Sequence, residues 1–405
     1  MTSPFIEQED LYGAHNYKPL PVVLTRGEGV YVWDENGKRY LDMMSAYSAV
    51  SHGHCHPKLV DALKHQASQL NIVSRAFYTD KLGPFLENIC KHTGFEKALP
   101  MNTGAEAVET ALKAARKWAY VVKGVPADKA EIIACSGNFH GRTISIVSMS
   151  TESQYRFGFG PFTPGFTIIP YGDVEALEHA ITPNTAAFLV EPIKGEGGII
   201  VPPKDYLAKC AAICKKHNVL LICDEIQTGL GRTGKLLACE HGGIKPDAVV
   251  LGKALGGGIL PVSLFLTRKE VMDVFTPGDH GSTFGGNPLA AAVAAKAIEV
   301  LFEENLIERA QKVGEYFQQR LRSLRSPLIK DVRGKGLLIG VEIDEKIPAR
   351  QICLQLLSFG ILTKETHNTV VRFAPPLIIT EEQIDVVINA LQQVLAEIDI
   401  KSTAK

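Results

Sequence analysis

Four short segments carry residue types that can do chemistry together, and the most reactive residue among them is a lysine. Lys253 follows the apolar run AVVLG and precedes Gly256, Gly257 and Gly258. A lysine amine in a largely desolvated site loses proton affinity and becomes nucleophilic enough to form a Schiff base with a carbonyl group. The glycines let the backbone approach a flat ligand closely. The alternative is an ordinary solvated lysine at the end of a strand.

A pair of carboxylates ends a second apolar run, in VLLICDEIQTGLGRTG. Asp224 and Glu225 follow this run directly, at the edge of a sheet where ligands bind. A carboxylate there can pair with the protonated pyridine nitrogen of pyridoxal phosphate, whose ring then serves as an electron sink. Asp224 is the better candidate because it continues the alternation of the strand. A helix N-cap at Asp224 is the structural alternative.

Two further segments can bind an anion such as phosphate. In NTGAEAVETALK, the letters TGAE are typical of a capping box, and Gly104 and Ala105 occupy the first helical turn. The backbone N–H groups of that turn are unpaired, and these side chains are too small to block them. In GDHGSTFGGNPLA, Ser282 and Thr283 offer hydroxyls and amides before another helix. Each segment alone says little, but the four together, in this order and spacing, are specific.

The chain from Glu131 to Thr267 has the pattern of an α/β domain. Short apolar runs alternate with helical patterns, and most runs are near-continuous in Val, Ile and Leu. Such runs are expected for strands buried on both faces of a mostly parallel sheet, with ligands at the carboxyl ends of the strands. The predicted strands are EIIAC, GFTIIP, AAFLVEP, VLLICDE, AVVLG and PVSLFLT.

The two ends of the chain predict a second, smaller α+β domain. Near the N-terminus, YVWDENGKRYLD is typical of a hairpin with its turn at Asn36-Gly37, and we assign it to the same domain as the C-terminus. We expect residues 1–45 to pack with the small domain, residues 46–290 to form the large domain, and residues 291–405 to form the C-terminal small domain. The C-terminal pattern consists of strands at GKGLLIGVEI and TVVRFAPP and of the amphipathic stretches NPLAAAVAAKAIEVLFEEN, LIERAQKVGEYFQQRLRSL and EEQIDVVINALQQVLAEI.

Length and composition exclude several classes of protein. A chain of 405 residues suits two domains around a shared site. Its 43 basic and 44 acidic residues give a formal charge of −1, which offers no electrostatic reason to expect nucleic acid or an anionic membrane as partner. The start MTSPFIEQEDLYG resembles neither a secretory signal nor a transit peptide, and no apolar run approaches the ~20 residues of a membrane span. We therefore expect a cytoplasmic protein.

Cysteine and histidine usage indicates neither a disulfide framework nor a metal site. The eight cysteines include no CxxC pair, and Cys210 and Cys214 read as small residues on the buried face of a helix. The histidines of SHGHCHPK have no nearby pattern of acidic ligands, so we expect them to be structural and expect no metal.

With these motifs in place, the sequence resembles the class III aminotransferases, a branch of the fold-type I pyridoxal-phosphate enzymes. The resemblance spans essentially the whole chain and is carried by DEIQTGLGRTG, by the lysine after an apolar strand and by GDHGSTFGGNPLA. It implies a large domain with a mostly parallel seven-stranded sheet, pyridoxal 5'-phosphate as cofactor, and a homodimer with shared active sites. It further implies that Lys253 binds the cofactor covalently and that Asp224 pairs with the pyridine nitrogen.

The resemblance assigns the remaining cofactor contacts residue by residue. Gln227 is implied near the phenolic oxygen of the cofactor, and Phe139 is implied to stack on its ring. The phosphate is implied to be bound by Gly104 and Ala105 of one subunit and by the segment Ser282–Thr283, in which Thr283 reaches in from the other subunit.

Within the family, the chain is most similar to the branch that acts on ornithine. In that branch the residue matching Tyr17 contacts the α-amino group of the substrate, and the one matching Tyr47 favours ornithine over simpler ω-amines. The match for Arg142 binds the α-carboxylate, and Glu196 and Arg372 match a switchable ion pair. The segments behind this similarity are GAHNYKPLPV, YSAVSHGHCHPK, SRAFY, RGKGLL and RFAPPL.

Two positions depart from the usual pattern of the ornithine branch. His140 in NFHGRT is shared with the acetylornithine branch, and Lys194 in IKGEGG stands where Gln is frequent. Both residues make the sequence slightly more similar to the acetylornithine enzymes. Tyr17 and Tyr47, which match the ornithine branch, are nevertheless present. Plainer roles also exist, because the tyrosines can be interface packing, Arg142 a helix cap and Glu196 a solvated loop residue.

The implied reaction transfers the δ-amino group of L-ornithine to 2-oxoglutarate. It gives glutamate-5-semialdehyde, which cyclises to pyrroline-5-carboxylate, and L-glutamate. Acetylornithine or 4-aminobutyrate as the donor are the alternatives within the family. A catalytically silent binding protein on the same fold is disfavoured, because Lys253 and Asp224 are both present.

Overall fold

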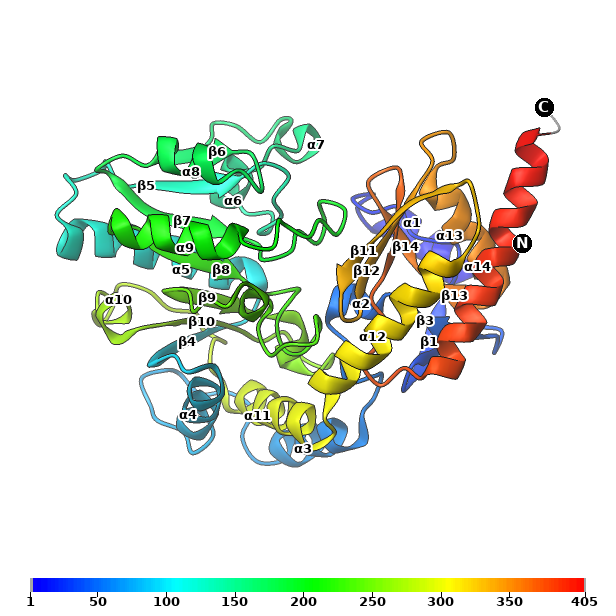
Figure 1. The fold of residues 1–405 in the computed structure, drawn as a ribbon. Coiled ribbons are helices and arrows are strands. Elements are labelled where there is room, and N and C mark those ends of the chain that lie inside the picture. Colours follow the sequence, from blue (N-terminus) through cyan, green and yellow to red (C-terminus); the bar gives the residue numbers. More distant parts are fainter. Residues whose placement is uncertain (1–2, 404–405) are drawn as a thin grey trace.

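A seven-stranded sheet organises the larger part of the molecule in the computed structural model, which describes residues 3–403 (Figure 1). The strand order is β4-β10-β9-β8-β7-β5-β6. The strands from β9 to β6 run parallel, and β10 is antiparallel to both β9 and β4. The predicted mostly parallel sheet is therefore confirmed. Its strands are β4 Lys97–Met101, β5 Glu131–Cys135, β6 Phe166–Ile169, β7 Thr185–Val190, β8 Leu220–Asp224, β9 Ala248–Leu251 and β10 Ser263–Thr267.

All six strands predicted from apolar runs are present, and the seventh, β4, lacks such a run. Its sequence KALPM contains a charged residue and Pro100. Proline is tolerated here because β4 lies at the edge of the sheet and pairs only with β10.

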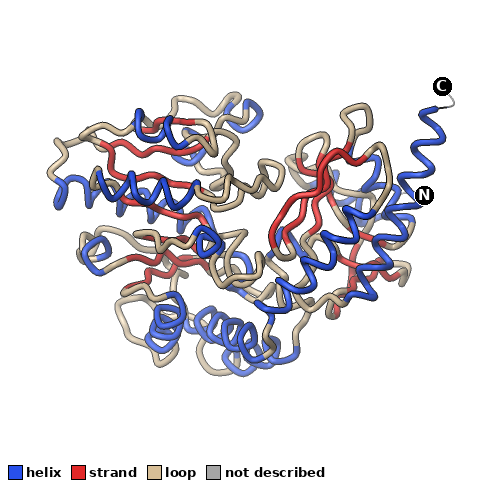
Figure 2. The backbone as a smooth tube through the Cα atoms, viewed as in Figure 1, coloured by secondary structure: helices blue, strands red, loops and turns tan. Residues whose placement is uncertain are grey.

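Both faces of the sheet are buried, as the continuous apolar runs predict. Along β8, Leu220 and Ile222 pack into one core and Leu221 and Cys223 into the other. Helix α5 (Gly104–Trp118) covers the first face, while α8 (Val174–Ala180) and α9 (Tyr206–Lys216) pack on the second. The sheet is thus the middle layer of three, as Figure 2 shows.

Three helices form a further layer beside the edge strand β4. Helix α11 (Pro288–Glu303) packs on α3 (Pro57–Ala67) and α4 (Leu82–Thr93), and it also contacts the 3-10 turn η3 (Lys253–Gly256). Most of its neighbours precede residue 290, although residues 291–405 are expected to form the C-terminal small domain. The domain boundaries themselves remain predictions.

The two ends of the chain meet in the smaller part of the molecule. The predicted hairpin is present as β2 (Tyr31–Asp34) and β3 (Arg39–Asp42), and β13 (Ile361–Leu362) pairs with β3 in parallel. This joins both termini in one sheet of order β1-β2-β3-β13, beside a second sheet of order β11-β12-β15-β14. The other strands are β1 Leu24–Glu28, β11 Ile329–Lys335, β12 Leu338–Ile343, β14 Lys364–Thr366 and β15 Val370–Phe373.

The remaining helices are mostly short or belong to the C-terminal part. The long ones are α12 (Leu306–Ser323), α13 (Ala349–Ser358) and α14 (Glu381–Thr403), of which α12 and α14 were predicted from the amphipathic stretches. The others are α1 Pro4–Tyr12, α2 Ser45–Ser48, α6 Ile144–Ser148, α7 Ser153–Arg156, α10 Lys269–Met272, η1 Ala119–Lys123 and η2 Ala238–Gly242.

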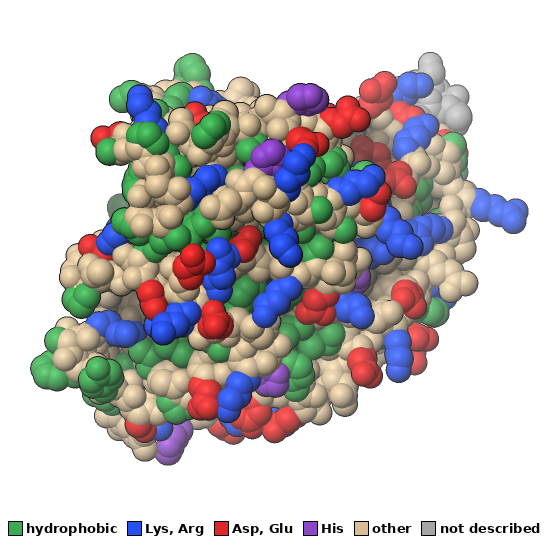
Figure 3. Space-filling model, turned by 60° about the vertical axis from the view of Figure 1, so that its left-hand side comes forward, with side chains coloured by type: hydrophobic (Ala, Val, Ile, Leu, Met, Phe, Trp, Pro, Cys, Tyr) green, Lys and Arg blue, Asp and Glu red, His purple; other side chains and the backbone are tan. Residues whose placement is uncertain are grey.

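The surface agrees with the balanced composition. Basic and acidic side chains are interspersed over most of the face shown in Figure 3. Within residues 3–403, no helix is long and apolar enough to cross a membrane.

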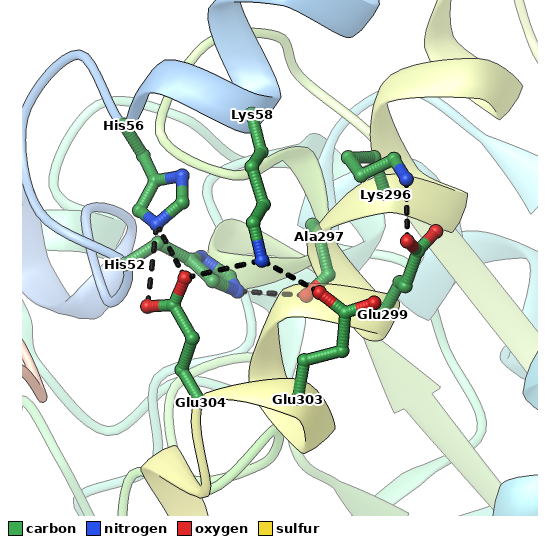
Figure 4. Close-up of polar contacts among 8 residues, drawn as sticks. All are labelled: His52, His56, Lys58, Lys296, Ala297, Glu299, Glu303 and Glu304. Carbon is green, nitrogen blue, oxygen red and sulfur yellow. Dashed lines mark hydrogen bonds and ion pairs between the residues drawn. The ribbon is translucent and has the colours of Figure 1, made fainter.

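The three histidines of SHGHCHPK have separate protein partners. His52 Nε2 lies 2.9 Å from the carbonyl oxygen of Ala297, and His56 pairs with Glu304 at 3.2 Å (Figure 4). His54 lies 2.8 Å from Asp42. Among the described residues, no group of three or more His, Cys, Asp or Glu side chains is placed to hold a metal ion.

Candidate active site

A cavity of about 210 Å³ lies at the carboxyl ends of the parallel strands. Asp224 ends β8, Lys253 follows β9, and Glu191 follows β7. Such an edge collects side chains from several strands at one place. All the predicted cofactor residues except Ser282 and Thr283 line the cavity, namely Gly104, Ala105, Phe139, Asp224, Gln227 and Lys253.

Lys253 has the environment expected of a nucleophilic amine. Its φ of +44° is unusual for a residue with a side chain, and it begins the turn η3 directly after the buried strand β9. A backbone held in this sparsely populated region is typical of functional sites. Burial lowers the pKa of the Lys253 amine, although nearby Glu196 partly opposes the shift. The neutral, reactive form is therefore favoured relative to a surface lysine.

Of the two carboxylates at the end of β8, only Asp224 faces the cavity. One of its oxygens lies 2.7 Å from His140 Nδ1, and the other accepts a hydrogen bond from the backbone of Ile226 at 3.0 Å. Glu225 points away, where Thr228 and the backbone of Cys239 donate to it. The alternation of the strand therefore predicts correctly that Asp224, and not Glu225, faces the cavity. Asp224 also accepts a turn-type hydrogen bond from the backbone of Ile226.

His140 and Glu191 complete this wall of the cavity and were not singled out as site residues. Burial alone would lower the pKa of His140, but the hydrogen bond to Asp224 and the charges of Asp224 and Glu191 together outweigh it, and the pKa is raised. Glu191 accepts backbone hydrogen bonds from Phe139 and Gly195, and burial raises its pKa to about 7. The sequence does contain a pattern that could have predicted Glu191 as a site residue. Glu191 follows the apolar run of AAFLVEP just as Asp224 follows that of VLLICDE.

The start of helix α5 also lines the cavity. The predicted capping box is present, since Thr103 Oγ1 accepts from Glu106 N at 3.2 Å and Glu106 accepts from Thr103 N at 2.8 Å. A Cβ atom at Gly104 would lie 3.0 Å from Ile226 Cδ1, so a larger residue there would require Ile226 to shift. The first-turn amides and the helix dipole at this point suit an anion.

The segment carrying Ser282 and Thr283 lies outside the cavity but is tied to the same helix start. Asn102 donates a hydrogen bond from Nδ2 to Ser282 Oγ at 2.8 Å, and Asn102 also contacts Glu106 of the capping box. Thr283 is exposed on the surface of the subunit. Thr283 does not line the inner cavity of its own subunit.

A second cavity, of about 330 Å³, opens outside the first. Phe139 and Glu196 line both cavities, so the two share a wall. The predicted substrate residues Tyr17, Tyr47, Arg142, Glu196 and Arg372 all line the outer cavity.

An ion pair between buried Arg372 and partly buried Glu196 lies where the two cavities meet. Arg372 Nη1 lies 2.5 Å from Glu196 Oε1, and Gln227 Nε2 donates to the same oxygen at 3.3 Å. Burial alone would raise the pKa of Glu196, but Arg372 and then Lys253 outweigh it and the pKa is lowered. The guanidinium of Arg372 also lies 4.7 Å from the centre of the Tyr47 ring, a cation–π distance. The predicted pair is formed.

Tyr47 is presented by a short left-handed turn. Ala46 and Tyr47 have φ values of +48° and +59° in a region that residues with side chains rarely adopt. Buried Arg232 holds this turn, because it donates to the hydroxyls of Ser45 at 3.3 Å and Ser51 at 3.0 Å. The strain is retained by surrounding contacts, as is common where a binding side chain must be aimed.

Together, the linings match the chemistry of one cofactor and one kind of substrate. The amine is complementary to an aldehyde, and the buried carboxylate to a cationic ring nitrogen. The aromatic ring is complementary to a flat ring, and the helix start to a phosphate. The outer cavity adds a guanidinium, Arg142, that is not paired with any carboxylate among the described residues. The arrangement can therefore hold pyridoxal phosphate inside and an amino acid outside.

Comparisons with known proteins agree with this arrangement. The family model for class III aminotransferases matches residues 12–395. An ornithine aminotransferase of Bacillus subtilis (strain 168) is 59% identical over 390 residues, covering 96% of this chain and 97% of the relative.

Two solved structures extend the comparison to three dimensions. An ornithine aminotransferase from Toxoplasma gondii ME49 superimposes with a TM-score of 0.96 at 47% identity, covering 98% of this chain and 95% of that chain. An acetylornithine aminotransferase from Elizabethkingia anophelis has a TM-score of 0.88 at 50% identity, covering 97% and 98%. The chain belongs to the class III aminotransferase family of pyridoxal-phosphate-dependent enzymes.

Proposed function

We propose that the chain is an ornithine δ-aminotransferase. It moves the δ-amino group of L-ornithine to 2-oxoglutarate, giving glutamate-5-semialdehyde, which cyclises to pyrroline-5-carboxylate, and L-glutamate. The observation that carries the proposal is the Glu196–Arg372 pair between the outer cavity and Lys253. An unpaired guanidinium next to the reacting centre would attract an α-carboxylate. With Arg372 masked, the site favours a donor whose carboxylate lies far from the reacting amine.

The inner cavity would hold the cofactor through six residues. Lys253 would bind it covalently, Asp224 would pair with the pyridine nitrogen, and Gln227 would lie near the phenolic oxygen. Phe139 would stack on the ring, and the amides of Gly104 and Ala105 would bind the phosphate. When bound, pyridoxal phosphate supplies an electron sink that acidifies the carbon bearing the reacting amine.

The outer cavity would orient the donor. Arg142 would bind the α-carboxylate of ornithine, Tyr17 would contact its α-amino group, and Tyr47 would favour ornithine over simpler ω-amines. The δ-amine would point past Glu196 towards Lys253 and would displace the lysine from the cofactor. The freed Nζ of Lys253 would then take the proton from the δ-carbon as general base and deliver it to the cofactor's C4′ as general acid. In the second half-reaction Glu196 would release Arg372, which then binds the 1-carboxylate of 2-oxoglutarate.

The relatives named ornithine aminotransferases, at 57–59% identity over nearly the full chain, support this substrate. We also propose a homodimer in which Thr283 reaches the phosphate of the other subunit, and a cytoplasmic location. The exposure of Thr283 on the surface of its own subunit supports the shared site.

N-acetylornithine is the second candidate donor, favoured by His140 and by the 50% identity to an acetylornithine aminotransferase. A half-reaction titration separates the candidates. The visible absorbance of the lysine-bound cofactor should fade at the lowest concentration with ornithine, and only at higher concentrations with N-acetylornithine or 4-aminobutyrate. A preference for N-acetylornithine would overturn the proposal.

A further inference from the structure

The guanidinium of Arg142 is held by aromatic rings rather than by a carboxylate. Its central carbon lies 3.8 Å from the centre of the Tyr155 ring and 5.6 Å from that of Phe139. No Asp or Glu of residues 3–403 forms an ion pair with it. Aromatic faces attract a guanidinium without occupying its N–H groups, so those donors stay free for a ligand in the outer cavity.

Tyr155 is the ring that makes the closer contact, and its own position is fixed. It lies in the short helix α7, where the next residue, Arg156, donates to the carbonyls of Val147, Ser148 and Ser150 at 2.8 to 3.2 Å. These bonds tie α7 to the end of α6. Burial raises the pKa of Tyr155, and the Arg142 charge opposes this only in part, so the ring stays a neutral phenol.

Tyr155 also touches the ring that separates the two cavities. Its centre lies 6.0 Å from the centre of Phe139, with the ring planes at 78°, an edge-to-face geometry. Phe139 lines the inner cavity as well as the outer one. Tyr155 therefore contacts both the cation of the outer cavity and the aromatic wall of the inner one.

We propose that Tyr155 is a positioning residue that fixes the plane of the Arg142 guanidinium for a substrate carboxylate. A bidentate carboxylate contact needs the two donor N–H groups in one plane, and a long arginine side chain loses conformational entropy when it adopts that plane. Stacking on Tyr155 restricts Arg142 before the substrate arrives. This inference rests on the proposed function, because it needs a substrate whose carboxylate lies far from the reacting carbon.

Two variants and two donors test the proposal on the cofactor-loaded enzyme. Tyr155→Leu removes the aromatic face and should raise the KM for ornithine about 2- to 30-fold, with kcat at saturation nearly unchanged. Tyr155→Phe keeps the face and should retain a KM close to that of the parent enzyme. The donor 1,4-diaminobutane has no carboxylate, so its single-turnover rate constant should be the same for the parent and both variants.

Three results would overturn the proposal: an unchanged KM in Tyr155→Leu, an equal loss with both donors, or a loss in Tyr155→Phe as large as in Tyr155→Leu. The proposed function is judged separately by whether the parent enzyme uses ornithine at all. If it does not, the KM for 2-oxoglutarate still tests Tyr155, because the distal carboxylate of that acceptor would occupy the same place.

Discussion

Two opposing requirements meet at Lys253. Its amine must be neutral to attack an aldehyde, yet carboxylates nearby, Glu196 above all, favour the charged form. Burial outweighs them, and the pKa falls below that of an ordinary lysine. The strained φ of +44° points the side chain into the cavity from the end of a rigid strand.

Replacing Lys253 by Ala should abolish turnover while leaving the fold intact, because it removes both the covalent attachment and the proton carrier. The measurement is the steady-state rate with ornithine and 2-oxoglutarate, with circular dichroism as the check on folding. Lys194→Ala is the matched control, since Lys194 is part-buried near the cavity but donates to the backbone of Ser136. A variant at Lys253 that kept more than about a thousandth of the rate would contradict the assignment.

Asp224→Asn should keep the cofactor bound but slow proton removal severely. A neutral amide cannot hold the pyridine nitrogen in its protonated form, so the ring withdraws electrons less well. Single-turnover kinetics with ornithine measure the effect. Glu225→Gln is the comparison, because Glu225 faces away from the cavity and bonds to Thr228 and Cys239. Equal rates in Asp224→Asn and the parent enzyme would leave Asp224 with a purely structural role.

Removing the carboxylate of Glu196 tests the ion pair. Glu196→Ala unmasks Arg372, so the 2-oxoglutarate half-reaction should persist while ornithine begins to react through its α-amine. Single-turnover rates with ornithine and glutamate, together with identification of the ornithine product, measure this change. Glu152→Ala is the control, because Glu152 lines the same outer cavity without pairing to Arg372. If the variant makes only the δ-semialdehyde and glutamate reacts no faster, the pair does not act as a switch.

At the scale of elements, strand ends and helix starts place the chemistry. The sequence predicts such a strand end or helix start correctly where a single local pattern determines it. Examples are the apolar run that ends at Asp224 and the capping box at Thr103. The sequence does not predict strand β4. Its proline is tolerated because β4 is an edge strand with a partner strand on one side only. Nor does the sequence predict the contact between His140 and Asp224, which joins residues 84 positions apart. Such contacts depend on the packed sheet rather than on any local pattern.

His52 should make the free energy of unfolding depend on pH. It lies just before helix α3 and contacts Ala297 of helix α11 (Figure 4). Burial lowers the pKa of His52 from 6.5 to about 4. Below pH 6.5 the unfolded chain therefore binds a proton that the folded chain excludes. The free energy of unfolding consequently decreases as the pH is lowered. Between pH 7.5 and pH 5 this single group should cost about 2 kcal/mol.

Urea unfolding at those two pH values measures the effect of His52. In His52→Gln the loss of stability on acidification should be smaller by about that amount, whatever the stability of the variant at pH 7.5. His56→Gln is the control, because His56 lies on the same segment as His52 but pairs with Glu304. An identical pH dependence in His52→Gln and the parent protein would show that His52 is not held neutral.

At the scale of the whole molecule, several exposed aromatic residues lie on segments near the start of α5. Phe77, Tyr78 and Phe284 are 68%, 104% and 57% exposed. The segments that carry them approach each other, because Gly286 lies against the side chain of Arg75 and Leu289 N donates to Asn71 O at 3.4 Å. Exposed aromatic groups of this size are typical of protein interfaces. Thr283 directly precedes Phe284, so a second copy of the chain on this surface would receive Thr283 at its edge.

Phe284→Asp should therefore convert the proposed dimer into monomers at micromolar concentration and weaken cofactor binding at the same time. A charge buried in the apolar part of an interface is costly, and a monomer lacks the Thr283 of its partner. Light scattering gives the mass, and the released cofactor absorbance gives the affinity. Val386→Asp is the control, because Val386 is 56% exposed on α14 and should leave the dimer intact. If Phe284→Asp stays dimeric and keeps its cofactor as tightly as the parent enzyme, the subunits meet elsewhere and Thr283 does not complete a neighbouring site.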